Sequence, residues 1–368
     1  MKKIGSFRLR RVSLRTFSPI LLCCFGCGAT DSDGIGPVLS GAWETAPKSV
    51  SLDVNPFEAA EAVALAEDTP VVLNAHFESG DAVVVYNLGA VAAGEGITVR
   101  KPDIAEGYVS VAFFDDQYDL LALGALWAPD GIGYRTNIEC PVSAASEAVY
   151  LALSVPDASV PADLSVEVVR GPGAGTPPVA PRDVVLDFQG ANNVTIGLGE
   201  PMRIPPFNAA DVSSRFEGMT EEITAMVEDF VREDFEALGI AVHNSAGMTP
   251  DGREAPVVYI GPADIPPAGA AGGDAVVDTA GLYVFESYHP GSGQLARVIA
   301  NVVSHEAGHL FGLNHTTDPN DIMQPTGSFS QLLIDRSFRH APLAREVFPI
   351  GAQDGAKWIV ARTAGGGH

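Results

Sequence analysis

One eleven-residue segment, from His305 to His315, constrains this chain more than any other feature. It fits the pattern H-E-x-x-H-x-x-G-x-x-H. Residues four apart lie on one face of a helix, so His305 and His309 can point at one ion. Gly312 allows a sharp turn, because glycine adopts positive φ without steric cost. That turn can bring His315 back to a third corner of the same site.

Three histidines at this spacing predict a metal site. Zinc binds four ligands in a tetrahedron, and three neutral imidazoles leave the fourth position open for water, which is the layout of a catalytic site. A structural zinc site is usually closed and rich in cysteine, and the sequence has no such cluster. We therefore expect one catalytic zinc ion, held by His305, His309 and His315. Glu306 lies beside the ion and is not needed as a ligand.

Apolar residues recur at helical spacing before and through this segment. Gly291 comes before the run and Gly312 follows it, as the start and stop signals of a helix should. Such flanks argue against a chance arrangement of the motif residues. The apolar positions are Leu295, Val298, Ile299, Val302, Val303 and Leu310.

The sequence from His305 to Pro325 resembles the metzincin zinc endopeptidases. Thr316 follows the third histidine and Met323 comes eight residues after it, which is similar to the matrixin version of the motif. The resemblance implies that Met323 is the Met-turn residue under the zinc site and not a ligand. It implies no tyrosine ligand, because Pro325 occupies the place where some metzincin families carry that tyrosine.

The expected reaction is hydrolysis of a peptide bond. Zinc would acidify its water and polarise the carbonyl, and Glu306 would take the proton of the water and pass it to the leaving amine. Two alternatives stay open. One is a surface-anchored binding or adhesion lipoprotein with a vestigial zinc site, against which the intact Glu306 argues, because a structural ion needs no base. The other is a zinc hydrolase of small or cell-wall peptides.

A cluster of proline and glycine over residues 171–182 has no periodicity and is predicted to be a linker. Before it, residues 48–170 contain short runs rich in valine and tyrosine with turn residues between them. Such a pattern predicts a β-sandwich, and its order resembles the pre-peptidase domains of secreted bacterial proteases. The predicted strands cover 71–77, 82–86, 108–114, 148–153 and 164–169.

The fold class expected for the whole chain is α+β, with residues 183–368 forming a metzincin-like catalytic domain after the β-sandwich. This domain would hold a twisted mixed sheet, long helices, the zinc helix and the Met-turn. An apolar stripe from Ile223 to Leu238 predicts one long helix, ended by Gly239. Strands are predicted at 184–188, 240–242, 256–260 and 281–285.

Two further expectations concern the surroundings of the zinc helix. By the family resemblance, the strand at 281–285 would be the sheet edge that aligns an extended substrate through backbone hydrogen bonds. Beyond Met323, the ranges 335–348 and 354–362 are expected to hold one or two short helices. The residues directly after Met323, including Gln324, should line the pocket for the substrate side chain beyond the cut.

Residues 1–26 are predicted to be an export signal, because they carry six basic residues and no acidic one. The apolar run at 19–25 is too short to span a bilayer. Cys27 and the polar stretch after it resemble a bacterial lipoprotein signal, which implies cleavage before Cys27, lipid on its thiol and a flexible tether over 27–47. The protein would then be anchored to a bacterial membrane or the cell surface. The alternative is a plain secretory signal and a soluble secreted or periplasmic protein.

The net charge of the chain limits the classes of partner that we expect it to bind. The sequence holds 22 Lys and Arg against 46 Asp and Glu, a formal net charge of −24, and six of the basic residues lie in the predicted signal. Such a chain repels nucleic acid and anionic membrane surfaces. The partners expected are a peptide or protein substrate, and the membrane through the lipid anchor alone. A monomer is expected.

The remaining cysteine, aspartate and histidine residues suggest little further chemistry. Cys140 would be the single cysteine of the mature protein outside the lipid site; it lacks the Pro-Arg-Cys-Gly context of a matrixin pro-segment and is expected to be buried and inert. Asp115, Asp116 and Asp119 could contribute to a calcium site, although a solvated turn is the favoured interpretation. The histidines without ligand spacing are His76, His243, His289, His340 and His368, of which His289 is close enough in sequence to border the cleft.

Overall fold

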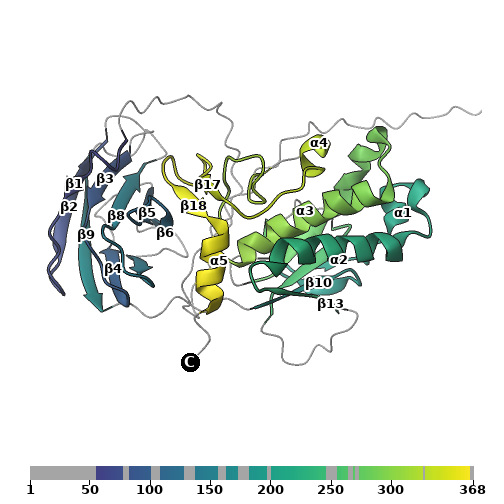
Figure 1. The fold of residues 1–368 in the computed structure, drawn as a ribbon, viewed down its shortest axis with the longest axis horizontal. Coiled ribbons are helices and arrows are strands. Elements are labelled where there is room, and N and C mark those ends of the chain that lie inside the picture. The colour runs from purple at the N-terminus through teal and green to yellow at the C-terminus, as the bar shows by residue number, and fades with distance from the viewer. Residues whose placement is uncertain are drawn as a thin grey trace, which may run out of the picture.

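The computed structural model describes residues 55–77, 83–100, 108–127, 137–155, 163–172, 182–196, 200–245, 255–263, 268–269, 273–325 and 328–364. The predicted export signal, Cys27 and the predicted tether lie outside these residues, as do His368 and residues 173–181 of the predicted linker. The described chain forms two parts that lie side by side, an all-β part and a part with both helices and strands (Figure 1). Within the described residues, every helix is too short or too polar to cross a membrane.

The first part consists of two sheets packed face to face, and we call it the β-sandwich. Buried side chains of both sheets meet in one apolar core, which includes Ile97, Val111, Phe113 and Val166. All strand pairs are antiparallel except β1 with β3. The five-stranded sheet has the order β1 (Glu61–Ala62), β3 (Val83–Asn87), β8 (Tyr150–Ser154), β5 (Tyr108–Phe114) and β6 (Leu120–Trp127). The four-stranded sheet has the order β2 (Val71–His76), β9 (Asp163–Pro172), β4 (Glu95–Arg100) and β7 (Asn137–Pro141).

Alternation of side chains explains why these segments form strands. Along β9, Leu164, Val166 and Val168 face the core, and the residues between them are more exposed. The end of β9 runs into the predicted linker, because Gly171 and Pro172 pair with the start of β4. Cys140 is buried in the same core, and burial raises the pKa of its thiol.

The second part, which we call the C-terminal part, is built on a five-stranded sheet. Its order is β13 (Ala241–Asn244), β10 (Asp183–Asp187), β14 (Val257–Gly261), β16 (Ala275–Asp278) and β15 (Ala268–Gly269). The first four strands are parallel, and β15 is antiparallel at the edge. The chain therefore has a mixed α+β fold, as predicted.

Two long helices, α2 (Thr220–Glu236) and α3 (Ser292–Leu310), lie side by side over this sheet (Figure 1). In α2 the buried residues are spaced four apart and are Ile223, Val227, Val231 and Phe235. This spacing gives the helix one apolar face, which packs into a core shared with α3 and the sheet. Gly239 ends the helical region at φ +71°, in the left-handed conformation that favours glycine.

Smaller elements complete the C-terminal part. They are β11 (Ala191–Val194), β12 (Met202–Ile204), α1 (Ala209–Val212), the 3₁₀ helices η1 (Ser214–Phe216) and η3 (Ala280–Tyr288), α4 (Phe329–Leu332), β17 (His340–Pro342), β18 (Ala352–Asp354) and α5 (Gly355–Ala364). The helix α5 covers the second predicted range, 354–362, except Asp354, which ends β18. The first predicted range, 335–348, holds no helix and contributes β17 to a two-stranded sheet with β18.

The strand predicted at 281–285 was wrong. These residues belong to η3, and the edge of the sheet is β15. The preceding strand β16 ends only two residues earlier, at Asp278. The carboxylate of Asp278 accepts a hydrogen bond from the backbone N–H of Ala280 at 2.9 Å, and the N–H of Leu282 donates to the carbonyl of Thr279 at 3.2 Å. These hydrogen bonds within the turn therefore favour the 3₁₀ helix over the strand that the apolar run predicts.

The β-sandwich and the C-terminal part share an apolar core of their own, which we call the junction core. It joins Phe114 and Leu120 of the sandwich to Leu343, Phe348 and Ile350. Polar contacts surround it, since the ammonium of Lys357 lies 3.3 Å from Asp115 and 3.2 Å from Asp119. The strands β17 and β18 lie between the two parts (Figure 1). The parts are thus held by direct packing.

Candidate metal centre

The helix α3 places two of the motif histidines near its C-terminal end. His305 and His309 are one turn apart, and α3 ends at Leu310. Gly312 has φ +84°, which reverses the chain and returns His315 to the first two. The Nε2 atom of His305 lies 3.2 Å from that of His309 and 3.3 Å from that of His315. The structure therefore brings the three histidines together, and we call them the histidine cluster.

The other ring nitrogen of each histidine faces an acceptor. The Nδ1 of His305 lies 2.8 Å from the carbonyl oxygen of Ile322, and the Nδ1 of His309 lies 2.8 Å from that of Leu313. Donation from Nδ1 to a carbonyl fixes the tautomer and leaves Nε2 with a lone pair. The Nδ1 of His315 instead lies 3.7 Å from Oε1 of Glu346, and this contact lowers the pKa of Glu346.

The geometry of the cluster fits a tetrahedral zinc ion. Imidazole nitrogens bound to zinc at about 2.05 Å stand about 3.3 Å apart in a tetrahedron. The two separations that involve His305 agree with this value. Burial, with the nearby His315 as the next cause, lowers the pKa of His305 to about 3, and burial lowers the pKa of His309 well below its usual value. Both rings are therefore neutral at neutral pH, as metal ligands must be.

Glu306 lies beside the cluster on α3 and is buried. Its Oε2 atom has no hydrogen-bond partner among the residues that the structure describes. Burial raises the pKa of its carboxyl to about 8. A buried carboxyl oxygen without a partner is costly in a protein interior, so its presence next to three histidines points to a functional group.

The edge strand β15 passes directly over Glu306. A Cβ atom added to Gly269 of β15 would lie 2.6 Å from the carbonyl oxygen of Glu306 and 3.3 Å from its Oε2. Such a contact with backbone is too close for any side chain, so this position requires glycine. The close approach brings the edge strand of the sheet next to the histidine cluster.

Met323 lies in a tight turn after the third histidine. It is fully buried and packs against Gly308 of α3. The carboxylate of Asp321 holds this turn, because it accepts a hydrogen bond from the hydroxyl of Thr316 at 2.7 Å and another from the backbone N–H of Met323 at 3.2 Å. Asp321 was not among the residues predicted from the sequence. The signal available was an acidic residue two positions before the methionine, a spacing typical of side-chain turns.

The other candidates lie outside the histidine cluster. Among the described residues, His305, His309 and His315 form the one group that could hold a metal ion. Asp115 and Asp119 bind Lys357 across the junction, so these ion pairs occupy oxygens that a calcium ion would need. The remaining described histidines are paired or exposed: His76 contacts Asp163, His243 contacts Asp183, His340 contacts Asp119, and His289 is exposed at φ +51°.

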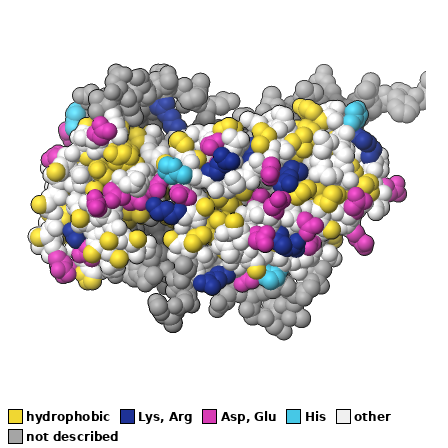
Figure 2. All heavy atoms as spheres, in the orientation of Figure 1, with side chains coloured by type: hydrophobic (Ala, Val, Ile, Leu, Met, Phe, Trp, Pro, Cys, Tyr) yellow, Lys and Arg dark blue, Asp and Glu magenta, His cyan; other side chains and the backbone are white. Residues whose placement is uncertain are grey.

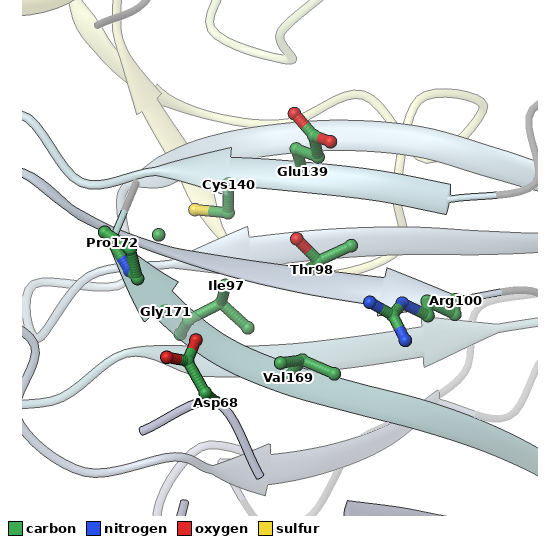
Figure 3. A pocket seen from close by; sticks show the side chains of 10 residues that line it. Asp68, Ile97, Thr98, Arg100, Glu139, Cys140, Val169, Gly171 and Pro172 are labelled. Atoms are coloured by element: carbon green, nitrogen blue, oxygen red, sulfur yellow. The ribbon is translucent and has the colours of Figure 1, made fainter. Parts of the chain in front are cut away.

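A separate hollow of about 220 Å³ lies on the four-stranded sheet of the β-sandwich (Figure 3). It forms where Gly96 pairs with Gly171, so that neither strand carries a side chain there. Arg100 at its rim forms an ion pair with Glu167 at 2.9 Å. No histidine lines it, and its other lining residues are Asp68, Ile97, Thr98, Glu139, Cys140, Val169 and Pro172.

Figure 2 shows the charged side chains on one face of the described chain. On the face drawn in Figure 2, acidic side chains of the described residues are scattered among apolar and basic ones.

A model of the Matrixin family of peptidases matches residues 230–333, which include the whole histidine cluster and Met323. No curated protein matches the chain. The family match and the three-histidine cluster together support a zinc-dependent metallopeptidase.

Several solved structures are similar to parts of this chain. A zinc-dependent peptidase from Methanocorpusculum labreanum has 13% identity over 42% of this chain and 93% of its own, with a TM-score of 0.27. Archaemetzincin from Methanopyrus kandleri has 15% identity over 50% of this chain and 94% of its own, with a TM-score of 0.25. The pre-peptidase C-terminal domain of collagenase from Bacillus anthracis has 21% identity over 30% of this chain and 93% of its own, with a TM-score of 0.22.

Proposed function

We propose that this protein is a zinc endopeptidase of the matrixin-like metzincin type, with His305, His309 and His315 as the zinc ligands. One observation carries the proposal, namely the convergence of three imidazoles, two of them buried, beside the unpaired Oε2 atom of Glu306. The separations of the His305 Nε2 atom from the other two Nε2 atoms fit tetrahedral zinc, and two of the rings are neutral at neutral pH.

Zinc at this site would supply a polarised carbonyl and a water of lowered pKa. Glu306 acts as the general base, taking the proton of the water on Oε2 and handing it to the leaving amine. In the metal-free protein, burial raises the pKa of this carboxyl to about 8. A positive charge beside it favours the carboxylate, so zinc loading prepares Glu306 to accept a proton.

An extended peptide is the substrate shape that suits the sheet edge. The strand β15 is antiparallel and at the edge, and Gly269 lies close to Glu306. A peptide that adds to this edge through backbone hydrogen bonds would place a carbonyl near the histidine cluster. Residues 281–285 were predicted to be the sheet edge that aligns the substrate. We assign this role to β15 instead. Met323 acts as the Met-turn residue and stays outside the ligand set.

The wider role follows from the sequence and is part of the same proposal. Residues 1–26 would direct export, Cys27 would carry lipid, and residues 27–47 would tether a monomeric protein to a bacterial membrane or the cell surface. The β-sandwich would be a pre-peptidase-like domain over residues 48–170, joined by a linker at 171–182 to a catalytic domain at 183–368. The soluble secreted or periplasmic form is the alternative.

A cleavage assay on an unstructured protein tests the activity. The wild type should cleave it, lose activity on chelation and regain activity with zinc. Glu306→Gln should keep its zinc and lower turnover by at least ~10² fold, the usual scale for a general base. Glu236→Gln is the matched control, because Glu236 is exposed on α2, and it should act as the wild type does.

Near-normal turnover of Glu306→Gln with zinc retained would refute the role of Glu306. Cleavage of short peptides alone would favour the hydrolase of small or cell-wall peptides. A wild type that binds zinc and cleaves neither class of substrate would favour a binding protein with a vestigial site.

A further inference from the structure

The third histidine differs from the other two in what faces its outer nitrogen. His305 and His309 each direct Nδ1 at a backbone carbonyl oxygen, at 2.8 Å in both cases. His315 directs Nδ1 at the carboxylate of Glu346, at 3.7 Å. The side chain of His315 is 6% exposed, and that of Glu346 is 40% exposed. His315 is thus the histidine of the cluster whose outer nitrogen faces a side chain and not a backbone carbonyl.

We propose that Glu346 is a positioning residue for His315, which rests on the proposed zinc site. A carboxylate that accepts the Nδ1 proton fixes the tautomer with Nε2 free and increases the basicity of the ligand nitrogen. The contact of 3.7 Å is longer than a hydrogen bond, which needs about 2.7–3.2 Å. We expect rotation of the Glu346 side chain, which is 40% exposed, to close this gap.

The backbone around Glu346 is fixed to the histidine itself. The N–H of Ala344 donates to the carbonyl oxygen of His315 at 2.9 Å, and Leu343 forms an antiparallel bridge with Thr316. A turn follows, in which the N–H of Phe348 donates to the carbonyl oxygen of Ala344 at 3.1 Å. Glu346 lies inside this turn, so its carboxylate starts close to the ring of His315.

The segment that carries Glu346, residues 343–350, is also fixed to the β-sandwich. Leu343, Phe348 and Ile350 belong to the junction core, and the ring centroids of Phe348 and Phe114 lie 5.8 Å apart. The segment therefore has an anchor on each side of Glu346. The sandwich thus contributes to the metal site indirectly, by holding the segment that carries the positioning carboxylate.

The test measures zinc affinity and the electronic spectrum of the bound metal. Glu346→Ala, Glu346→Gln and the control Glu236→Ala are compared with the wild type in the full chain. Zinc affinity is measured by competition with a chromophoric chelator, and cobalt(II) replaces zinc for the absorption spectrum. Thermal unfolding of the metal-free proteins checks that each variant keeps the fold, as the exposure of Glu346 leads us to expect.

Glu346→Ala should weaken zinc binding by about 10- to 100-fold, the usual effect of losing a partner of a metal-bound histidine. Its cobalt spectrum should shift, because the imidazole of His315 is no longer held in one orientation. Glu346→Gln should lose less affinity, since the amide oxygen still accepts a hydrogen bond from Nδ1. Glu236→Ala should match the wild type in affinity and spectrum.

Unchanged zinc affinity and an unchanged cobalt spectrum in Glu346→Ala would overturn the inference. Equal losses in Glu346→Ala and Glu236→Ala would overturn it as well. If the wild type binds no zinc, the proposed function is contradicted. If the wild type binds zinc but no more tightly than Glu346→Ala does, this inference alone is contradicted.

Discussion

Burial determines the charge state of the individual residues in the site. It lowers the pKa of His305 to about 3 and raises the pKa of Glu306 to about 8, in both cases as the largest cause. Neutral forms are favoured on both residues, because the interior solvates charge poorly. A cation bound at the imidazoles would restore the carboxylate form of Glu306. Both residues are thus suited to a site in which a bound metal ion supplies the positive charge.

His309→Ala should remove most of the zinc, because two imidazoles and water make a poor site. We expect about one zinc ion per chain in the wild type and a small fraction of that in the variant, measured by elemental analysis after dialysis. His243→Ala is the control, since His243 contacts Asp183 outside the cluster, and it should keep its zinc. Undiminished zinc in His309→Ala would refute the ligand assignment.

At the scale of whole elements, α2 and α3 are joined by a polar contact inside their apolar interface. The hydroxyl of Ser304 on α3 donates a hydrogen bond of 2.6 Å to Asp234 on α2. Burial raises the pKa of Asp234 from 3.8 to about 7, although the bond from Ser304 opposes this. The carboxyl is therefore protonated in the folded protein over a pH range in which the unfolded chain has lost that proton.

This difference makes the helix pair sensitive to pH. The folded state binds the Asp234 proton more tightly, so its contribution to stability is full below pH 3.8 and is lost as pH rises through about 7. Asp234→Asn keeps an oxygen for Ser304 and carries no titratable group. Its melting temperature relative to the wild type should therefore increase between pH 4 and pH 8, by on the order of 2–4 °C if about 1 kcal/mol is involved.

Thermal unfolding of the metal-free proteins at several pH values measures this difference. Asp229→Asn is the control, because Asp229 is exposed on the same helix and forms an ion pair with Arg232. Its melting temperature relative to the wild type should change little from pH 6 to pH 8. An Asp234→Asn difference that is constant or declines with rising pH would contradict the prediction.

Periodic elements could be predicted from the sequence, and irregular ones could not. The apolar stripe of α2 gives the helix and its end at Gly239, and the run rich in valine and aromatic residues at 108–114 matches β5. The run 281–285 is five residues long, and such a run fits a strand or a buried helical turn equally well. Turn bonds from Asp278 decide in favour of η3. The strands β4, β6 and β7 were not identified.

The same contrast holds for the site. The spacing of His305, His309 and His315 indicates a cluster because helix geometry and one glycine turn are local properties. Glu346 lies 31 residues beyond His315 in the sequence, and no local pattern connects the two. Gly269 likewise reaches Glu306 only through the pairing of β15 with β16. Contacts of this kind depend on tertiary packing, which a single sequence does not encode in any local pattern.

At the scale of the whole molecule, the junction core holds the β-sandwich and the C-terminal part together. Phe114 is fully buried there, with its ring centroid 5.2 Å from that of Phe57 and 5.8 Å from that of Phe348. Phe113, the preceding residue on β5, points to the opposite face and belongs to the core of the sandwich itself. These neighbours form a matched pair for separating the stability of the sandwich from the stability of the junction.

Phe114→Ala should weaken the junction, because truncation of a buried phenylalanine costs about 3–5 kcal/mol. A protease site is inserted between residues 172 and 182, and the cleaved protein is analysed by size-exclusion chromatography. The wild-type fragments should elute together, since the junction core and the contacts of Lys357 hold them. The Phe114→Ala fragments should elute apart, whereas the Phe113→Ala fragments should stay together, because that change leaves the junction core intact. Wild-type fragments that separate on cleavage would show that the junction contributes too little to hold the two parts.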